Sequence, residues 1–114
     1  IKFHFNSFIK NTSIATSTMI IKRKITKDIK FTNTAICEDY HFKCKILKKV
    51  KFAYCIKRYL TKYRIRENSL QSNKLKNFFW IWMINYKYNR LTFLENFNSL
   101  LNISLNSIKK YGFK

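Results

Sequence analysis

The sequence predicts an all-α protein in which a long basic N-terminal arm and helix lead into a small helical head. Three observations support this fold class: an apolar stripe at helical spacing over residues 46–63, an aromatic stripe over residues 75–86, and a helix start signal at Thr92. With 114 residues, the chain has room for one small domain. We expect residues 1–45 to form a largely irregular extension and basic arm, and residues 46–114 to form the long basic helix and the head.

The charge of the chain is strongly unbalanced. Lys and Arg total 24 against five acids, which gives a formal net charge of +19. Repulsion on this scale destabilises an isolated compact state, so we expect a polyanionic partner, either nucleic acid or an anionic membrane surface. Hydrophobic residues make up 46% of the chain, which excludes a purely disordered polybasic tail. The longest apolar run, residues 78–84, is too short to span a membrane.

The first part of the chain carries weak signals. Residues 1–19 contain Ser, Thr and Asn with two lysines and no acid, which fits either a mitochondrial transit segment without its arginines or a short extension lying on a partner. A basic cluster follows at Lys22, Arg23 and Lys24, and such a cluster is either solvated or in contact with phosphate. Residues 31–42 show no clear period and are predicted to be irregular.

A basic amphipathic helix is predicted from Lys43 to Arg66. Its apolar stripe consists of Ile46, Val50, Ala53, Ile56, Leu60 and Tyr63, with basic side chains on the opposite face. Ten basic residues occur over residues 43–66 without one acid, whereas an ordinary surface helix mixes its signs. We therefore expect this face to track a phosphate backbone, and we expect a break at residues 67–69.

An aromatic helix is predicted from about residue 70 to residue 88. An aromatic stripe at helical spacing is more often core than a base-stacking surface. The buried side is therefore expected to hold Leu75, Phe78, Phe79, Trp82, Met83 and Tyr86. Trp80 lies off this stripe and is the candidate for stacking or for contact with a partner.

The last part of the chain is predicted to form a short helix that folds back antiparallel on the aromatic helix. Thr92 and Glu95 have the spacing of a capping box. Apolar residues then follow at helical spacing: Phe93, Leu94, Phe97, Leu100 and Leu101. A final short turn is expected to begin with Asn106 as its cap and to stop at Gly112.

No catalytic or metal-binding motif is predicted. Cys37, His41, Cys44 and Cys55 are residue types that bind zinc, but one helix would hold Cys44 and Cys55 roughly 16 Å apart, too far to share an ion. The odd number of cysteines argues against a disulfide framework. The chain has no glycine-rich phosphate loop and no nucleophile elbow, and its two histidines have no recognisable partner. We therefore expect no enzyme activity, no cofactor and no metal.

Short blocks over residues 50–111 resemble protein twenty of the large ribosomal subunit, of the bacterial and organellar type. The run FWIWMIN at residues 79–85 is similar to a leucine-tryptophan-isoleucine run of that family, and the matching residues are Trp80, Ile81, Ile84 and Asn85. Three further blocks match at residues 62–67, 91–101 and 103–106, the first through Tyr63, Arg66 and Glu67. The glycine- and arginine-rich arm of the family is not recognisable here.

The resemblance implies a structural constituent of an organellar large ribosomal subunit that binds large-subunit ribosomal RNA, contacts neighbouring ribosomal proteins and supports assembly. The bias toward Ile, Lys, Asn, Phe and Tyr indicates an AT-rich organellar genome, and we expect a mitochondrion in preference to a plastid. The residues expected to bind this RNA are Lys22, Arg23, Lys24, Lys48, Lys51, Lys57, Arg58, Lys62, Arg64, Arg66, Lys74 and Lys76. Two alternatives stay open, a basic accessory subunit of a mitochondrial inner-membrane complex and a DNA-binding helical module.

Overall fold

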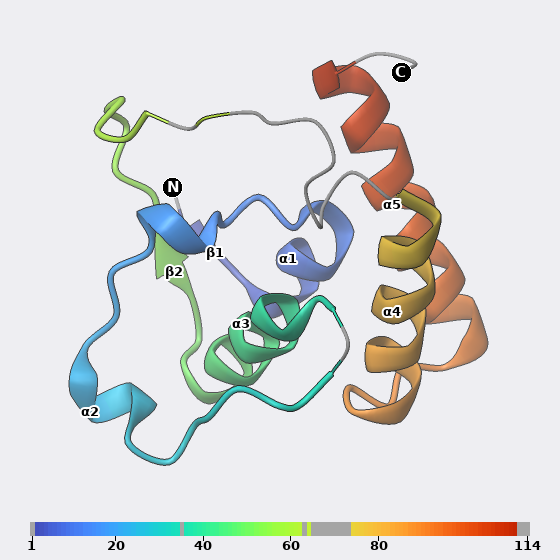
Figure 1. Ribbon diagram of the computed structural model, residues 1–114, viewed down its shortest axis with the longest axis horizontal. Coiled ribbons are helices and arrows are strands. Elements are labelled where there is room, and N and C mark those ends of the chain that lie inside the picture. The colour runs from blue at the N-terminus through green and yellow to red at the C-terminus, as the bar shows by residue number, and fades with distance from the viewer. Residues whose placement is uncertain (1, 35, 63, 65–73, 112–114) are drawn as a thin grey trace.

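Helices make up most of the computed structural model, which describes residues 2–34, 36–62, 64 and 74–111 (Figure 1). The predicted all-α class is confirmed. The helices are α1 (Phe5–Asn11), α2 (Arg23–Thr26), α3 (Glu38–Lys49), α4 (Lys74–Lys87) and α5 (Phe93–Tyr111), with a 3₁₀ turn, η1 (Thr16–Thr18). Two short strands, β1 (Lys2–Phe3) and β2 (Ala53–Tyr54), pair antiparallel.

The hydrophobic core lies where α1 meets α3 and α5, and α4 packs along α5 (Figure 1). Phe8 of α1 is fully buried and stacks on Tyr40 of α3, with ring centroids 5.4 Å apart. The core cluster consists of Phe8, Ile9, Tyr40, Cys44, Leu47, Ile81, Ile84 and Ile103. The stretch expected to be an irregular arm therefore supplies part of the core, because Phe8 and Ile9 lie on the buried face of a short helix.

A buried hydrogen-bond network joins four helices beside the apolar core. Tyr40 Oη donates to Asn85 Oδ1 at 2.8 Å, and Asn85 Nδ2 donates to Asn96 Oδ1 and to Ser99 Oγ, each at 3.2 Å. Ser99 Oγ donates in turn to the carbonyl of Ile9. Buried polar groups are tolerated only when they are paired in this way. Asn85 therefore connects α4 to α3 and α5, and through Ser99 to α1.

The predicted long basic helix ends early, at Lys49. Val50 is extended, and the residues that follow turn to pair with the N-terminal strand. Phe52 packs edge-to-face on His4 with ring centroids 6.0 Å apart, and Lys2 Nζ lies 4.6 Å from the centroid of the Phe52 ring. These contacts stabilise the extended chain. A continued helix would instead place basic residues next to one another on its surface, with no acid to pair with them.

This early end changes the predicted apolar stripe. Ile46 is buried, but Ile56 and Leu60 lie beyond the helix and are exposed. Tyr63 and Arg66 fall outside the residues that the structure describes. A stripe at helical spacing shares one face only while the helix continues, so the prediction fails where the helix stops.

α4 buries only part of the predicted side: Phe78 packs against the core, and Trp82 and Met83 are half-buried. Ile81, Ile84 and Asn85 are buried, whereas three residues expected in the core are exposed: Leu75, Phe79 and Tyr86. The reason lies in the polar network, because a buried amide such as that of Asn85 needs its partners inside the fold. The face of α4 that carries Asn85 therefore turns inward.

The C-terminal part of the structure confirms two predictions and corrects one. The backbone N–H of Thr92 donates to Glu95 Oε1 at 3.3 Å, and the N–H of Glu95 donates to Thr92 Oγ1 at 3.2 Å, which is the predicted capping box. α5 then folds back along α4, as expected (Figure 1). However, α5 continues unbroken to Tyr111. Asn106 therefore lies inside the helix, where its side chain donates to the Lys10 carbonyl instead of capping a new turn.

Candidate functional site

Among the four described carboxylates, one is held inside the fold. Asp28 and Glu38 are exposed, and Glu95 is engaged in the capping box. Asp39 is partly buried, with 36% of its side chain exposed. It lies in the first turn of α3, where the helix dipole favours a negative charge. Asp39 is therefore the described carboxylate that is best positioned to act as a fixed charge or as a base.

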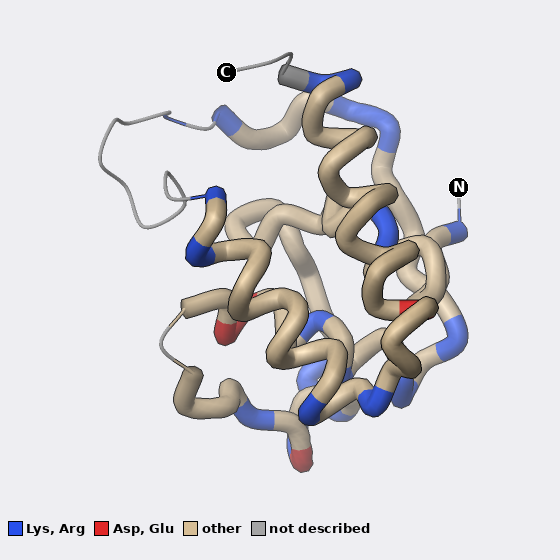
Figure 2. Tube along the Cα trace, turned by 90° about the vertical axis from the view of Figure 1, so that its right-hand side faces the viewer, with Lys and Arg blue, Asp and Glu red and all other residues tan. Residues whose placement is uncertain are grey.

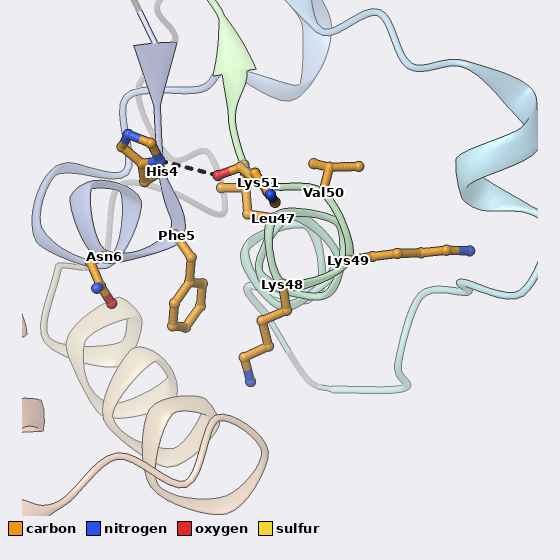
Figure 3. A pocket seen from close by; sticks show the side chains of 8 residues that line it. All are labelled: His4, Phe5, Asn6, Leu47, Lys48, Lys49, Val50 and Lys51. Atoms are coloured by element: carbon orange, nitrogen blue, oxygen red, sulfur yellow. Dashed lines mark hydrogen bonds between the residues drawn. The ribbon is translucent and has the colours of Figure 1, made fainter.

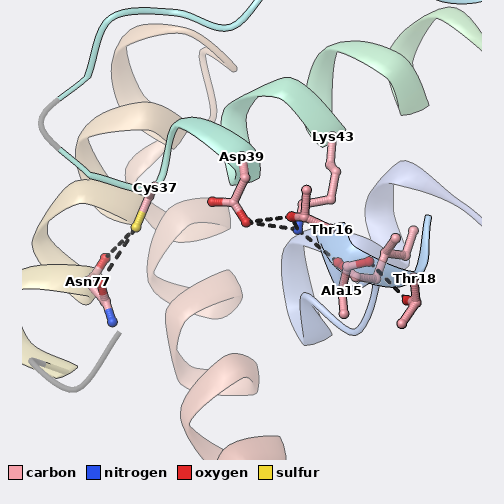
Figure 4. Close-up of polar contacts among 8 residues, drawn as sticks. Ala15, Thr16, Thr18, Cys37, Asp39, Lys43 and Asn77 are labelled. Carbon is pink, nitrogen blue, oxygen red and sulfur yellow. Dashed lines mark hydrogen bonds and ion pairs between the residues drawn. The ribbon is translucent and has the colours of Figure 1, made fainter. Parts of the chain in front are cut away.

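Two side chains hold Asp39 in place (Figure 4). Thr16 Oγ1 donates to Asp39 Oδ2 at 2.8 Å, and Lys43 Nζ lies 3.2 Å from the same oxygen. Lys43 is buried and also donates to the carbonyl of Ile14 at 2.8 Å. The segment around η1 is thereby fixed against the start of α3, although the two are distant in sequence.

The electrostatic surroundings keep Asp39 ionised at neutral pH. Burial by itself raises the pKa of Asp39. The charge of Lys43 and the hydrogen bonds from Thr16, Lys43 and the Tyr40 backbone outweigh that effect, so the pKa lies below the usual 3.8. A carboxylate of this kind is present in its base form throughout the physiological pH range.

A strained turn precedes this carboxylate. Cys37 is the N-cap of α3 and has a φ of 61°, in the left-handed region that costs a non-glycine residue about 1–2 kcal/mol. Its Sγ lies 3.8 Å from Asn77 Oδ1 at the start of α4 (Figure 4). Burial, with the charges of Asp39 and Glu38, raises the pKa of the Cys37 thiol to about 11. Cys37 is therefore a poor nucleophile and serves to position the turn.

A basic pocket lies at the other end of α3 (Figure 3). It has a volume of about 370 Å³ and is lined by His4, Phe5, Asn6, Leu47, Lys48, Lys49, Val50 and Lys51. Lysines at a helix C-terminus compensate its dipole, and Lys49 Nζ already donates to the Ile25 carbonyl at 3.1 Å. At about 1.5 Å per residue, the pocket is roughly 15 Å from Asp39. No small reacting group can contact both places.

The residues predicted to bind RNA are spread over the surface of several elements (Figure 2). The described ones lie at α2 (Lys22, Arg23, Lys24), at the end of α3 (Lys48, Lys51), after β2 (Lys57, Arg58, Lys62, Arg64) and at the start of α4 (Lys74, Lys76), whereas Arg66 lies outside the described residues. Trp80 is partly buried and meets Phe79 edge-to-face at 6.0 Å. The structure thus brings Lys48 and Lys51 to one pocket and does not place the set on one helix face.

In the part of the chain that the structure describes, no three His, Cys, Asp or Glu side chains lie close enough to hold one metal ion. None of its helices is both long enough and apolar enough to cross a bilayer.

Asp39 and Lys43 are not among the residues that the sequence periodicity indicates as functional. Residues 31–42 have no apolar period, which is why they were expected to be irregular. The available signal was charge: Glu38 and Asp39 are adjacent in a chain with five acids, and acids are favoured in the first turn of a helix. Lys43 follows Asp39 by four residues, the spacing of an ion pair on a helix.

Comparison with known proteins shows similarity to a bacterial protein assigned to sugar transfer. Over 106 residues the chain is 30% identical to TuaG of Bacillus subtilis (strain 168), which is provisionally named as a teichuronic acid biosynthesis glycosyltransferase. The similarity covers 93% of this chain and 42% of TuaG, so the chain spans less than half of that protein's length. No protein-family model matches the chain, and no solved structure matches it.

This similarity overturns the ribosomal interpretation. It extends over nearly the whole chain and leads to an enzyme of sugar transfer, not to a structural constituent of a ribosome or an accessory subunit of a membrane complex. The expected partners, ribosomal RNA and ribosomal proteins, and the expected lack of enzyme activity are corrected with it. The ribosomal resemblance depended on short blocks built mainly of Ile, Asn and aromatic residues. Such blocks recur by chance in a chain so rich in these residues. The mitochondrial location stays a prediction.

Proposed function

We propose that this chain is part of a glycosyltransferase and that it supplies a carboxylate that assists sugar transfer to a hydroxyl group. The observation that carries the proposal is the 30% identity to TuaG over 93% of the chain. For this chain we propose the reaction class alone: a glycosyl group moves from an activated donor, such as a sugar nucleotide, to an acceptor hydroxyl.

This reaction makes two demands on a protein. The acceptor hydroxyl must lose its proton as its oxygen bonds to the anomeric carbon, and a positioned base can take that proton. The bond from the anomeric carbon to the leaving group breaks at the same time, and the phosphate of the leaving group takes the electron pair. Positive charge near that phosphate then stabilises the transition state.

Asp39 fulfils the first demand better than the other described carboxylates. Thr16 and Lys43 hold Asp39 in one orientation, and it is unprotonated at neutral pH, although its lowered pKa makes it a weak base. A hydroxyl can still reach it, because about a third of its side chain is exposed. A fixed orientation matters because a general base acts only within hydrogen-bond reach of the proton that it removes.

The test compares Asp39→Asn with Asp28→Asn in the protein that contains this chain. Asparagine keeps the shape of aspartate and can still accept the Thr16 hydrogen bond, so the fold should survive, which circular dichroism checks. The assay measures transfer of radiolabelled sugars from a panel of sugar nucleotides to saccharide acceptors. We expect transfer by the wild-type protein, a loss of about 10²-fold to 10⁴-fold in turnover for Asp39→Asn, and an unchanged rate for Asp28→Asn. The proposal fails if the wild-type protein transfers no sugar or if Asp39→Asn keeps the full rate.

A further inference from the structure

The outward face of α5 is apolar although it is exposed. Its large side chains are 47–77% exposed: Phe93, Leu94, Phe97, Leu101 and Leu105. At about 100° per residue, these five positions fall within a sector of about 120° on the helix. Exposed apolar groups that are gathered on one face in this way mark an interaction surface.

The inward face of the same helix carries both apolar and polar side chains, because Ile103 is buried in the core and Leu100 packs against it. Asn96 and Ser99 are buried, and their side chains donate to the carbonyls of Trp82 and Ile9. A surface helix normally confines its apolar residues to the inward side, whereas α5 carries them on both sides. Because the polar side chains already have partners inside the fold, rotating the helix would leave them unpaired. The exposed apolar face is therefore fixed outward and is available to another apolar surface.

The charges around this face identify the covering surface. Basic residues stand near the ends of α4 and α5, at Lys74, Lys76, Lys87, Arg90, Lys109 and Lys110, and Glu95 is the one acid in residues 74–111. Figure 2 looks onto this side and shows the middle of both helices without Lys or Arg. Helices that lie in a membrane surface combine these features, with an apolar side in the acyl region and lysines at the level of the headgroups.

We propose that α5 docks the protein onto the surface of an anionic lipid bilayer. Phe93, Phe97 and Leu101 face the acyl chains, and Lys109, about 100° around the helix from the centre of this face, lies at the phosphate headgroups. A second copy of the chain is a poorer occupant, because it would bring together two chains that each carry a net charge of +19. The inference is independent of sugar transfer, and it places α5 on the bilayer, since no described helix can cross one.

The first test is co-sedimentation with vesicles. The wild-type protein, the double variant Leu101→Ser with Leu105→Ser, and a matched control, Ile56→Ser with Leu60→Ser, are mixed with phosphatidylglycerol–phosphatidylcholine vesicles. The control also removes two exposed apolar side chains, but from the segment after β2. We expect the α5 variant to bind about tenfold more weakly, the control to bind like wild type, and neutral phosphatidylcholine vesicles to bind less protein. Equal binding by all three proteins, or no binding by the wild type, would overturn the proposal.

The second test reports contact with lipid directly. In a Cys55→Ser background, a fluorophore that responds to polarity is attached to Leu101→Cys or to Leu60→Cys. On addition of anionic vesicles, we expect a blue shift at position 101 and none at position 60. A shift at both positions or at neither would contradict docking by α5. Sedimentation equilibrium without lipid tests a second copy of the chain as the occupant. Docking on lipid would also be contradicted if the wild type formed a dimer that the Leu101→Ser, Leu105→Ser variant abolishes and did not bind vesicles.

Discussion

Tyr40 Oη donates a hydrogen bond of 2.8 Å to Asn85 Oδ1 inside the core, although the two residues stand 45 positions apart on α3 and α4. Asn89 Nδ2 donates to the same oxygen at 3.0 Å. Burial, with the neighbouring Cys44, raises the pKa of Tyr40 well above its ordinary value, so the phenol remains a donor. The hydrogen bond therefore ties the helix that carries Asp39 to the α4–α5 pair.

Replacing Tyr40 by phenylalanine should weaken the fold. The ring of Tyr40→Phe can still stack on Phe8, but Asn85 Oδ1 loses one of its two donors. We expect the free energy of unfolding to fall by about 1–2 kcal/mol, measured by urea denaturation as a lower midpoint at an unchanged slope. The exposed Tyr54→Phe should leave the midpoint unchanged. An unchanged midpoint in Tyr40→Phe would show that the hydrogen bond does not contribute.

The fold class was predictable because local signals dominate it. The capping box of Thr92 and Glu95 needs only residues three positions apart, and the antiparallel packing of α4 and α5 follows from a short connection. The direction in which each helix faces was not predictable in the same way. Periodicity shows which side chains share a face, and burial of Asn85 and Ser99 shifts the inward side away from the expected one.

Only part of the candidate site could be predicted from the sequence. The spacing of Asp39 and Lys43 fits an ion pair on a helix, and a sequence alone can show it. The contact from Thr16 to Asp39 joins residues 23 positions apart, and no local pattern indicates it. That contact depends on the fold of the segment between η1 and α3, so only the structure could show that Asp39 is held in place.

His41 should make the stability of the protein depend on pH. It is buried, its Nδ1 has no hydrogen-bond partner among the described residues, and its ring packs on Tyr88 at 4.3 Å. Burial, with the charges of Lys45 and Lys48, lowers the pKa of His41 to about 4. Between pH 6.5 and 4, the unfolded chain thus binds a proton that the folded chain does not. The free energy of unfolding should be highest above pH 6.5. It should fall by up to about 3 kcal/mol on acidification to pH 4.

The variant His41→Phe tests this dependence, because it keeps a flat ring against Tyr88 and cannot bind a proton. Urea denaturation of both proteins at pH 7 and pH 4.5 should show a smaller loss in the variant. The same loss in both proteins would exclude His41 as its source.

The three cysteines should differ in their reactivity. Cys55 is exposed, whereas Cys44 is fully buried, and burial raises the pKa of the Cys44 thiol to about 11. The pKa of Cys37 is raised to about 11 as well. A thiol reagent such as dithiobis-nitrobenzoate should therefore modify the native protein in one fast step, followed by slow steps that accelerate in urea. Cys55→Ser should remove the fast step and Cys37→Ser should leave it, and a fast step that survives Cys55→Ser would assign the reactivity elsewhere.

Replacing Lys43 by methionine should weaken the contacts around Asp39 without leaving a cavity. Methionine can fill the space of the aliphatic stem of Lys43, whose Nζ lies 5.8 Å from the centroid of the Phe8 ring. The variant loses the hydrogen bonds from Nζ to the Ile14 carbonyl, Thr16 and Asp39. We expect a loss of about 1–3 kcal/mol in the free energy of unfolding, whereas the exposed Lys24→Met should cost little.

The same variant should also raise the pKa of Asp39, because the charge of Lys43 is the largest contribution that lowers it. A lowered carboxyl pKa stabilises the fold above pH 3.8, and this stabilisation is lost as the pH falls through the folded pKa. Lys43→Met should therefore lose less stability on acidification below pH 3.8 than the wild type does. An NMR titration of the Asp39 carboxyl carbon measures the pKa directly. If the pKa does not rise, Lys43 does not hold Asp39 as a carboxylate, and Thr16 and the helix dipole must do so instead.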